Sequence, residues 1–199
     1  IPEARYNETG VPVIVSPGAL GGHNWYPMSF SQKTNLVYLP ATENYMGYVA
    51  QPEFERSERG WNTGTDMAEG ARLVAAAGDA APQRSAYLLA WDPVAQREVW
   101  RQPQLVPTAA AGVMSTAGGL VFQGNAAGEF VAYRDTDGER LWSHITQSHT
   151  VAAPISYMLD GTQYVAVVTG SRALPQVGPG AIGSTTRESS NNSRVLVYA

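Results

Sequence analysis

One segment of this chain occurs twice, and the distance between its two copies limits the folds that the chain can adopt. Residues 90–100 (Ala-Trp-Asp-Pro-Val-Ala-Gln-Arg-Glu-Val-Trp) align with residues 132–142 (Ala-Tyr-Arg-Asp-Thr-Asp-Gly-Glu-Arg-Leu-Trp), so that Trp100 and Trp142 lie 42 residues apart. Each copy begins at an alanine that ends an apolar strand, crosses a polar turn, and finishes with an aliphatic residue before the tryptophan. A period of this length is typical of one four-stranded blade of a β-propeller. We therefore expect Trp100 and Trp142 at equivalent positions of consecutive antiparallel sheets.

The segments around the repeat follow the same order of strands and turns. Short apolar runs, which predict strands, alternate with turns rich in glycine. The predicted strands are 36–39, 120–123, 129–134, 152–157, 163–169 and 195–198, with turns at 124–128 and 160–161. Residues 40–64 lack clean periodicity, Met67–Ala81 is compatible with a short helical turn or a flexible loop, and 173–192 is a Gly/Pro/Ser-rich loop. The predicted fold class is all-β, a partial β-propeller of about three to four blades.

Such a number of blades is too small to close a ring. A partial propeller exposes two flanks of blade-packing surface, and large apolar patches seldom stay exposed to water. The chain also opens at Ile1 without an initiator Met or a signal peptide, and Arg194–Ala199 is a strand with no cap or tail. We therefore expect both ends to be cuts through a larger architecture, with the remaining blades supplied by more polypeptide or by another chain.

Composition excludes several classes of function. The formal net charge of the 199 residues is −4, with no basic stripe to neutralise phosphates, which argues against a nucleic-acid partner. No apolar run reaches the length that spans a membrane. The chain has no cysteine, which excludes a disulfide, a thiolate metal site and a Cys-x-x-Cys-His haem attachment within it.

The segment Gly21–Phe30 (Gly-Gly-His-Asn-Trp-Tyr-Pro-Met-Ser-Phe) carries the most distinctive chemistry. Its glycines allow tight backbone geometry or close approach to a ligand. Asn24 can donate and accept hydrogen bonds, and Trp25 offers a flat apolar face with one donor. An amide beside a large aromatic side chain suits a planar ligand with carbonyl or carboxylate oxygens. The alternative is a loop in which Trp25 fills the core and Asn24 caps a turn.

The same segment resembles the Gly-x-His-Asn-Trp-x-Pro-Met-Ser-(Phe/Tyr) element of dehydrogenases that depend on pyrroloquinoline quinone (PQQ), the quinoprotein alcohol dehydrogenases. The resemblance covers nearly the whole chain, and residues 90–100 and 132–142 are degenerate copies of that family's tryptophan-docking motif. It implies an eight-bladed periplasmic propeller that oxidises a small alcohol by hydride transfer to PQQ. It also implies that Asn24 and Trp25 contact the cofactor. The ligands of the family's Ca²⁺ and its catalytic Asp match nothing here, so they are expected outside this chain.

Other candidate sites are weaker. His144 and His149 have no convergent third ligand nearby in the sequence, which favours surface histidines at strand ends over a metal site. His23 is expected to orient the loop rather than to move protons. Where the resemblance implies the element Gly-Trp-Gly-Gly, this chain has Gly170-Ser171-Arg172-Ala173. Arg172 could present a cation toward the propeller axis, but an exposed arginine of a loop is the favoured interpretation. The glycines of 178–183 do not link a strand to a helix, so they predict no dinucleotide loop.

Three hypotheses follow. In the first, residues 1–199 are the C-terminal blades of a PQQ-dependent alcohol dehydrogenase, inactive alone, with Asn24 and Trp25 in the cofactor pocket. In the second, the chain is a non-catalytic propeller scaffold with PQQ-like repeats, a class without the Gly21–Met28 element. In the third, it is a fragment that binds nothing alone.

Overall fold

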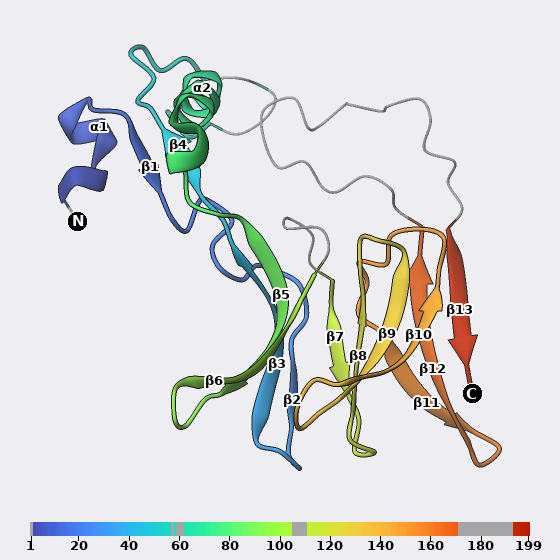
Figure 1. Ribbon diagram of the computed structural model, residues 1–199. Helices are drawn as coiled ribbons and strands as arrows, with labels where there is room; N and C mark the ends of the chain where they lie inside the picture. The colour runs from blue at the N-terminus through green and yellow to red at the C-terminus, as the bar shows by residue number, and fades with distance from the viewer. Residues whose placement is uncertain (1, 57, 59–61, 105–110, 171–192) are drawn as a thin grey trace. The chain divides into compact units, whose positions relative to one another are not determined.

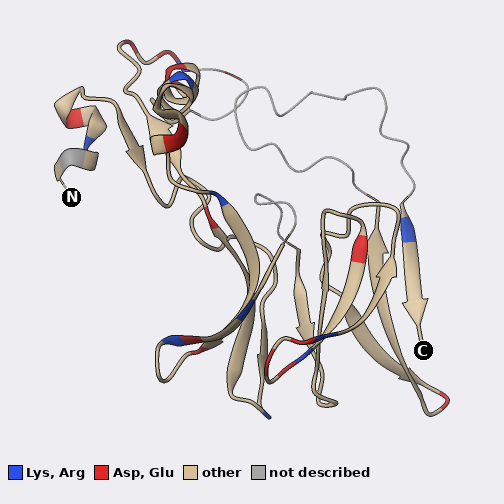
Figure 2. Ribbon diagram, viewed as in Figure 1, with Lys and Arg blue, Asp and Glu red and all other residues tan. Residues whose placement is uncertain are grey.

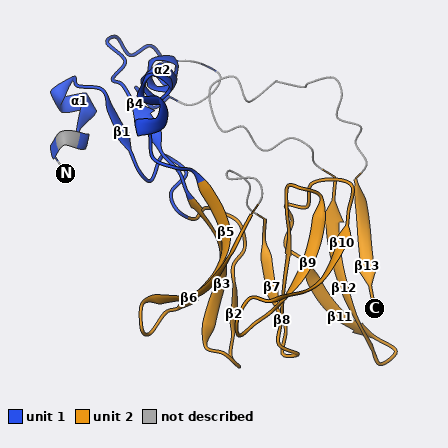
Figure 3. Cartoon of the chain, viewed as in Figure 1, with its two compact units in different colours: residues 1–22, 43–84, 175–187 blue, residues 23–42, 85–174, 188–199 orange. Residues whose placement is uncertain are grey.

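The computed structural model describes residues 2–56, 58, 62–104, 111–170 and 193–199. The chain divides into two compact units, which Figure 3 distinguishes by colour. The first unit comprises residues 1–22, 43–84 and 175–187, and the second comprises residues 23–42, 85–174 and 188–199. No helix among the described residues has the length and hydropathy needed to cross a membrane.

The first unit combines short helices with a small sheet. Its elements are a 3₁₀ turn at Pro2–Ala4, α1 (Tyr6–Thr9), β1 (Val13–Val15), β4 (Met46–Tyr48), α2 (Met67–Ala77) and a 3₁₀ turn at Gly78–Ala80. The helical alternative for Met67–Ala81 is therefore confirmed. Helix α2 begins where the Asp66 carboxylate accepts the backbone N–H groups of Ala68 and Glu69, as a side-chain cap does. Strand β4 pairs with β1, so residues 40–64 are less irregular than predicted.

Three antiparallel sheets make up the second unit, and Figure 1 shows them side by side. The first sheet has the order β2-β3-β5-β6, the middle sheet β10-β9-β8-β7, and the third sheet β11-β12-β13. The strands of the first sheet are β2 (Ser29–Ser31), β3 (Leu36–Glu43), β5 (Ser85–Asp92) and β6 (Arg97–Pro103). The others are β7 (Val113–Ser115), β8 (Leu120–Gly124), β9 (Glu129–Arg134), β10 (Arg140–Ile145), β11 (Ile155–Leu159), β12 (Thr162–Thr169) and β13 (Arg194–Tyr198). This arrangement confirms the predicted partial propeller.

The two copies of the repeat occupy equivalent places in their sheets. Ala90 of β5 lies opposite Trp100 of β6, and Ala132 of β9 lies opposite Trp142 of β10. A register shift follows next to the pair in both sheets. The alanine leaves room for the indole across the ladder, as the repeat predicts.

The core consists of two layers, one on each face of the middle sheet. Side chains alternate along a strand, so β9 contributes to both layers. Val131 and Tyr133 pack toward the first sheet, whereas Phe130 and Ala132 pack toward the third. The layer between the first and middle sheets comprises Leu36, Tyr38, Leu88, Ala90, Trp100, Val113, Val121, Val131 and Tyr133.

Trp100 connects the first sheet to the middle sheet through a hydrogen bond. Its indole N–H donates to the backbone carbonyl of Asp135 at 3.0 Å, and the hydroxyl of Tyr38 donates to the same carbonyl at 2.9 Å. Trp100 is only 8% exposed. Trp142 packs against Phe130 and Tyr198 but keeps 40% of its surface exposed.

The far face of the third sheet carries an exposed apolar surface. Ile155, Ala166 and Val197 stand in one row across the three strands, as the register dictates. The exposed hydrophobic residues of this face are Ile155, Tyr157, Leu159, Val168, Val195 and Val197. Figure 2 shows that β7, β8, β11 and β12 carry no charged residue. The sequence predicts such a flank for an incomplete propeller.

Candidate functional site

The loop formed by residues 23–28, here called the His23–Met28 loop, leads into β2 and is held at both ends. At its start, Nδ1 of His23 lies 2.7 Å from the carbonyl oxygen of Pro40 in β3. A carbonyl oxygen only accepts, so the imidazole nitrogen donates. At its end, the carbonyl of Pro27 accepts the backbone N–H of Val113 in β7 at 2.9 Å. The loop is therefore fixed to both the first and the middle sheet.

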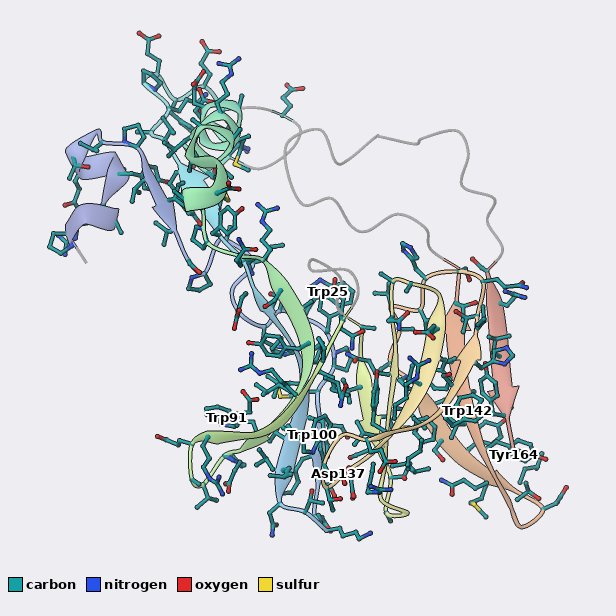
Figure 4. The ribbon with its side chains drawn as sticks, viewed as in Figure 1. Trp25, Trp91, Trp100, Asp137, Trp142 and Tyr164 are labelled. Atoms are coloured by element: carbon teal, nitrogen blue, oxygen red, sulfur yellow. The ribbon has the colours of Figure 1, made fainter. Side chains whose placement is uncertain are left out.

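Between these two hydrogen bonds lie the residues that the sequence singles out. The side-chain oxygen of Asn24 accepts the backbone N–H of Trp25 at 2.8 Å. Trp25 is 62% exposed, and its ring stacks on that of Tyr26 with centroids 4.2 Å apart and an interplanar angle of 27°. Partial burial raises the pKa of the Tyr26 hydroxyl. Figure 4 shows the labelled Trp25 at the end of the first sheet away from Trp91.

This geometry tests the alternative in which Trp25 fills the core and Asn24 caps a turn. Trp25 does not fill the core, because most of its surface faces water. Asn24 does make a local bond to the backbone, as the capping alternative proposed. An exposed indole supported by a second aromatic ring presents a flat apolar surface, with an amide beside it.

The loops that precede the innermost strands of the three sheets lie next to one another. The N–H of Gly112, before β7, donates to the carbonyl of Val151, before β11, at 3.0 Å. A methyl group on Gly112 would lie 2.6 Å from the Cβ of Ala153, so only glycine fits there. On the strands themselves, the hydroxyls of Ser29 and Ser115 are 2.7 Å apart. The His23–Met28 loop is therefore one part of a continuous rim formed by three sheets.

Sequence reasoning missed several members of this rim. Tyr26 occupies the variable position of the Gly-x-His-Asn-Trp-x-Pro element, so nothing marked its ring as the support of Trp25. The carbonyl of Pro27 and the N–H of Gly112 belong to the backbone, which a side-chain motif does not report. The one signal in the sequence was Gly112 itself, because a glycine directly before a strand can mark a close approach of two backbones.

The remaining sequence candidates lie elsewhere. The described residues contain no group of three or more His, Asp or Glu side chains that is suited to a metal ion. His144 lies on β10 with its ring stacked on Trp142, whereas His149 is half-buried rather than at the surface. Arg172 falls outside the described residues.

Comparison with known proteins finds chains that are similar to this one. Residues 92–165 match the family model "PQQ: Glucose/ethanol/alcohol dehydrogenase, beta-propeller domain". The chain is 40% identical over 191 residues to the quinohemoprotein alcohol dehydrogenase of Comamonas testosteroni, covering 86% of this chain and 25% of the relative. It is 38% identical over 199 residues to quinohemoprotein alcohol dehydrogenase ADH IIB of Pseudomonas putida, covering 100% of this chain and 27% of the relative. The chain is therefore similar to a partial region of PQQ-dependent alcohol dehydrogenases.

Solved structures of the PQQ-dependent dehydrogenases agree with the fold described above. The crystal structure of the Comamonas testosteroni enzyme superposes with a TM-score of 0.70 at 37% identity, over 84% of this chain and 25% of that one. A europium-containing methanol dehydrogenase shares the fold with a TM-score of 0.71 at 24% identity, over 96% of this chain and 35% of that one. The chain spans about a quarter of the length of the quinohemoprotein relatives that it matches.

Proposed function

We propose that this chain is the C-terminal part of the propeller of a periplasmic PQQ-dependent alcohol dehydrogenase, and that Asn24 and Trp25 line its cofactor pocket. The observation that carries the proposal is the His23–Met28 loop, which is bonded to two sheets and presents Asn24 and Trp25 between those bonds. The substrate would be a small alcohol. PQQ, when bound, supplies the acceptor for the hydride that leaves the alcohol carbon.

The residues present fit such a cofactor. PQQ is planar, anionic and rich in carbonyl oxygens, so it needs donors and a flat apolar surface. Asn24 and Trp25 each carry side-chain N–H donors. The indole rests on Tyr26, which holds its plane. Residues 23–28 contain no Asp or Glu that would repel an anion. We therefore assign to Asn24 a hydrogen bond to an oxygen of the ring and to Trp25 a contact at the ring edge.

The charge that builds up on a reduced quinone gives Asn24 a second role. Donors fixed in advance stabilise developing negative charge most effectively where water is excluded. The bond from the Trp25 N–H to the Asn24 oxygen orients the amide before any ligand arrives. Asn24 would then both hold the cofactor and favour its reduced form.

The rest of the enzyme would come from further sheets. The apolar face of the third sheet, with Ile155, Val168 and Val195 exposed, is the surface on which we expect the next sheet to pack. The Ca²⁺ ligands and the catalytic Asp would lie in that remaining polypeptide. We therefore propose that residues 1–199 form an incomplete domain, inactive without its completion.

A titration tests the proposal. The polypeptide that contains this chain together with the remaining sheets is titrated with PQQ, and its Trp25→Leu variant is compared with Trp91→Leu. Trp91 lies on β5 at the opposite end of the sheet, so it controls for the loss of a tryptophan. We expect Trp25→Leu alone to weaken PQQ binding. No binding by the wild type would favour the non-catalytic scaffold instead.

A further inference from the structure

The side chain of His23 attaches the His23–Met28 loop to a neighbouring strand. Its Nδ1 lies 2.7 Å from the Pro40 carbonyl, and the ring is half-buried. The ladder between β2 and β3 ends at the pair Ser29 and Tyr38. Pro40 lies two residues beyond that pair and has no N–H of its own. The imidazole therefore continues the attachment of the first sheet's inner edge after the strand pairing stops.

The bond also determines the chemistry of the ring. Because the carbonyl only accepts, Nδ1 must carry the hydrogen, and in the neutral ring Nε2 then carries the lone pair. A bond of this kind fixes both the tautomer and the orientation of the imidazole. His23 is adjacent in sequence to Asn24, so a fixed His23 backbone limits where the Asn24 amide can point.

The second attachment of the loop lies at Pro27, whose carbonyl accepts the N–H of Val113. Three residues, Asn24 to Tyr26, lie between the two attachments. A short segment fixed at both ends has little conformational freedom, so its side chains lose little entropy when a ligand binds. The Pro27 attachment uses the backbone alone and would survive most substitutions. The His23 attachment depends on one side chain.

We propose that His23 is a positioning residue for the cofactor: through its Nδ1–H bond to Pro40 it holds Asn24 and Trp25 in the geometry that receives the ring. This inference rests on the proposed function, since it assigns His23 a role in the same site. His23 itself need not touch the cofactor. Its contribution is to fix the loop in advance, so that binding does not have to order it.

Two substitutions separate the hydrogen bond from the shape of the ring. His23→Asn places an amide N–H near the position of Nδ1 and can still donate to Pro40. His23→Phe keeps a planar ring but has no donor. The two variants are compared with the wild type in the polypeptide that contains this chain and the remaining sheets. The measurements are PQQ affinity by titration and the melting temperature without PQQ.

We expect His23→Phe to weaken PQQ binding about tenfold, which corresponds to about 1.4 kcal/mol, and His23→Asn to restore most of the affinity. Equal PQQ affinity of the wild type and His23→Phe, with or without a lower melting temperature, would overturn the positioning role while leaving the proposed function intact. Failure of the wild type to bind PQQ would overturn both.

A measurement without PQQ tests the geometry itself. In ¹⁵N-histidine-labelled protein, the imidazole signal that disappears in His23→Asn belongs to His23. We expect its Nδ1 to carry a proton, and in the neutral ring we expect Nε2 to show the shift of an unprotonated nitrogen. A His23 ring whose Nδ1 carries no proton would contradict the assigned bond to Pro40, independently of any cofactor.

Discussion

Gly138 lies directly beneath the indole ring of Trp100, so closely that a methyl group on its Cα would be 2.6 Å from Cε3 of that ring. Gly138 belongs to the turn between β9 and β10 and has a φ of +75°, in the left-handed region that favours glycine. The contact between Trp100 and Gly138 therefore sets how closely the first and middle sheets approach each other at this point. The same indole donates to Asp135 three residues earlier.

Gly138→Ala should therefore destabilise the protein for two reasons: the left-handed backbone, which costs about 1–2 kcal/mol, and the collision with Trp100. Gly128→Ala provides the matched control. Gly128 has a φ of +82°, but its nearest neighbour would lie 3.5 Å from the new methyl group, an ordinary contact. Chemical unfolding should show a clearly larger loss for Gly138→Ala. Equal losses would mean that the neighbouring sheet yields to the methyl group.

Trp100→Ala and Trp142→Ala should differ although the two residues are equivalent in register. Trp100 is nearly buried and donates to Asp135, so its truncation should cost about 3–5 kcal/mol. Trp142 is 40% exposed and should cost about 1–2 kcal/mol. Unfolding of both variants of the 199-residue chain measures the difference. A larger loss at Trp142 would show that burial does not govern the two sites.

Asn24→Ala and Asn24→Asp separate the local bond from the role toward the cofactor. Asp keeps an oxygen that accepts the Trp25 N–H, but it loses the amide donors and adds a negative charge. In the completed protein, both variants should weaken PQQ binding by about tenfold or more, equivalent to about 1.4 kcal/mol. The melting temperature without PQQ should change little, least of all for Asp. Unchanged affinity combined with a large fall in melting temperature would show that Asn24 is only a structural cap.

The isolated 199 residues should not turn over an alcohol. We expect the Ca²⁺ ligands and the catalytic Asp outside this chain, and Asn24 and Trp25 alone offer neither a base nor a metal. Dye reduction with added alcohol, PQQ and Ca²⁺ is the measurement, with the completed protein as the positive control. Sustained turnover by the purified chain would refute this assignment.

The hairpin of β9 and β10 should weaken in acid. A hydrogen bond from Arg140, with a second from Asn125, lowers the pKa of Glu129. A folded-state pKa below the unfolded value contributes stability above the unfolded pKa, and this contribution is lost as the pH falls through the folded-state pKa. Glu129→Gln should therefore lower stability near neutral pH and flatten its dependence on pH below about 4.5. Unfolding of both forms across this range provides the comparison, and parallel curves would contradict the assignment.

The sheets were predictable because their signals are local. The pairing of Ala90 with Trp100 spans ten residues, and the turn at Asp160 and Gly161 places both residues at positive φ, as that dipeptide favours. The pairing of Val13 with Tyr48 crosses a long stretch of chain and follows no repeat, so its register could not be inferred from the sequence.

In the candidate site, too, the sequence identifies residues that belong to a motif but not the contacts that position them. Asn24 and Trp25 could be named because a motif carries them, but their exposure depends on contacts made by the backbone. Pro40 lies seventeen residues from His23 in the sequence, so the hydrogen bond between its carbonyl and the imidazole could not be predicted from the sequence. The ring of Tyr26 became significant only through its stacking on Trp25.

Residues that are adjacent along a strand of the middle sheet belong to different layers of the core. Phe130 and Val131 are bonded to each other, yet one packs toward the third sheet and the other toward the first. Their substitutions should therefore add nearly independently, whereas Val131 and Leu88 share a layer and should show coupling in a double-mutant cycle. We therefore expect coupling between residues of facing sheets that share a layer, and nearly independent effects at adjacent positions along a strand of the middle sheet.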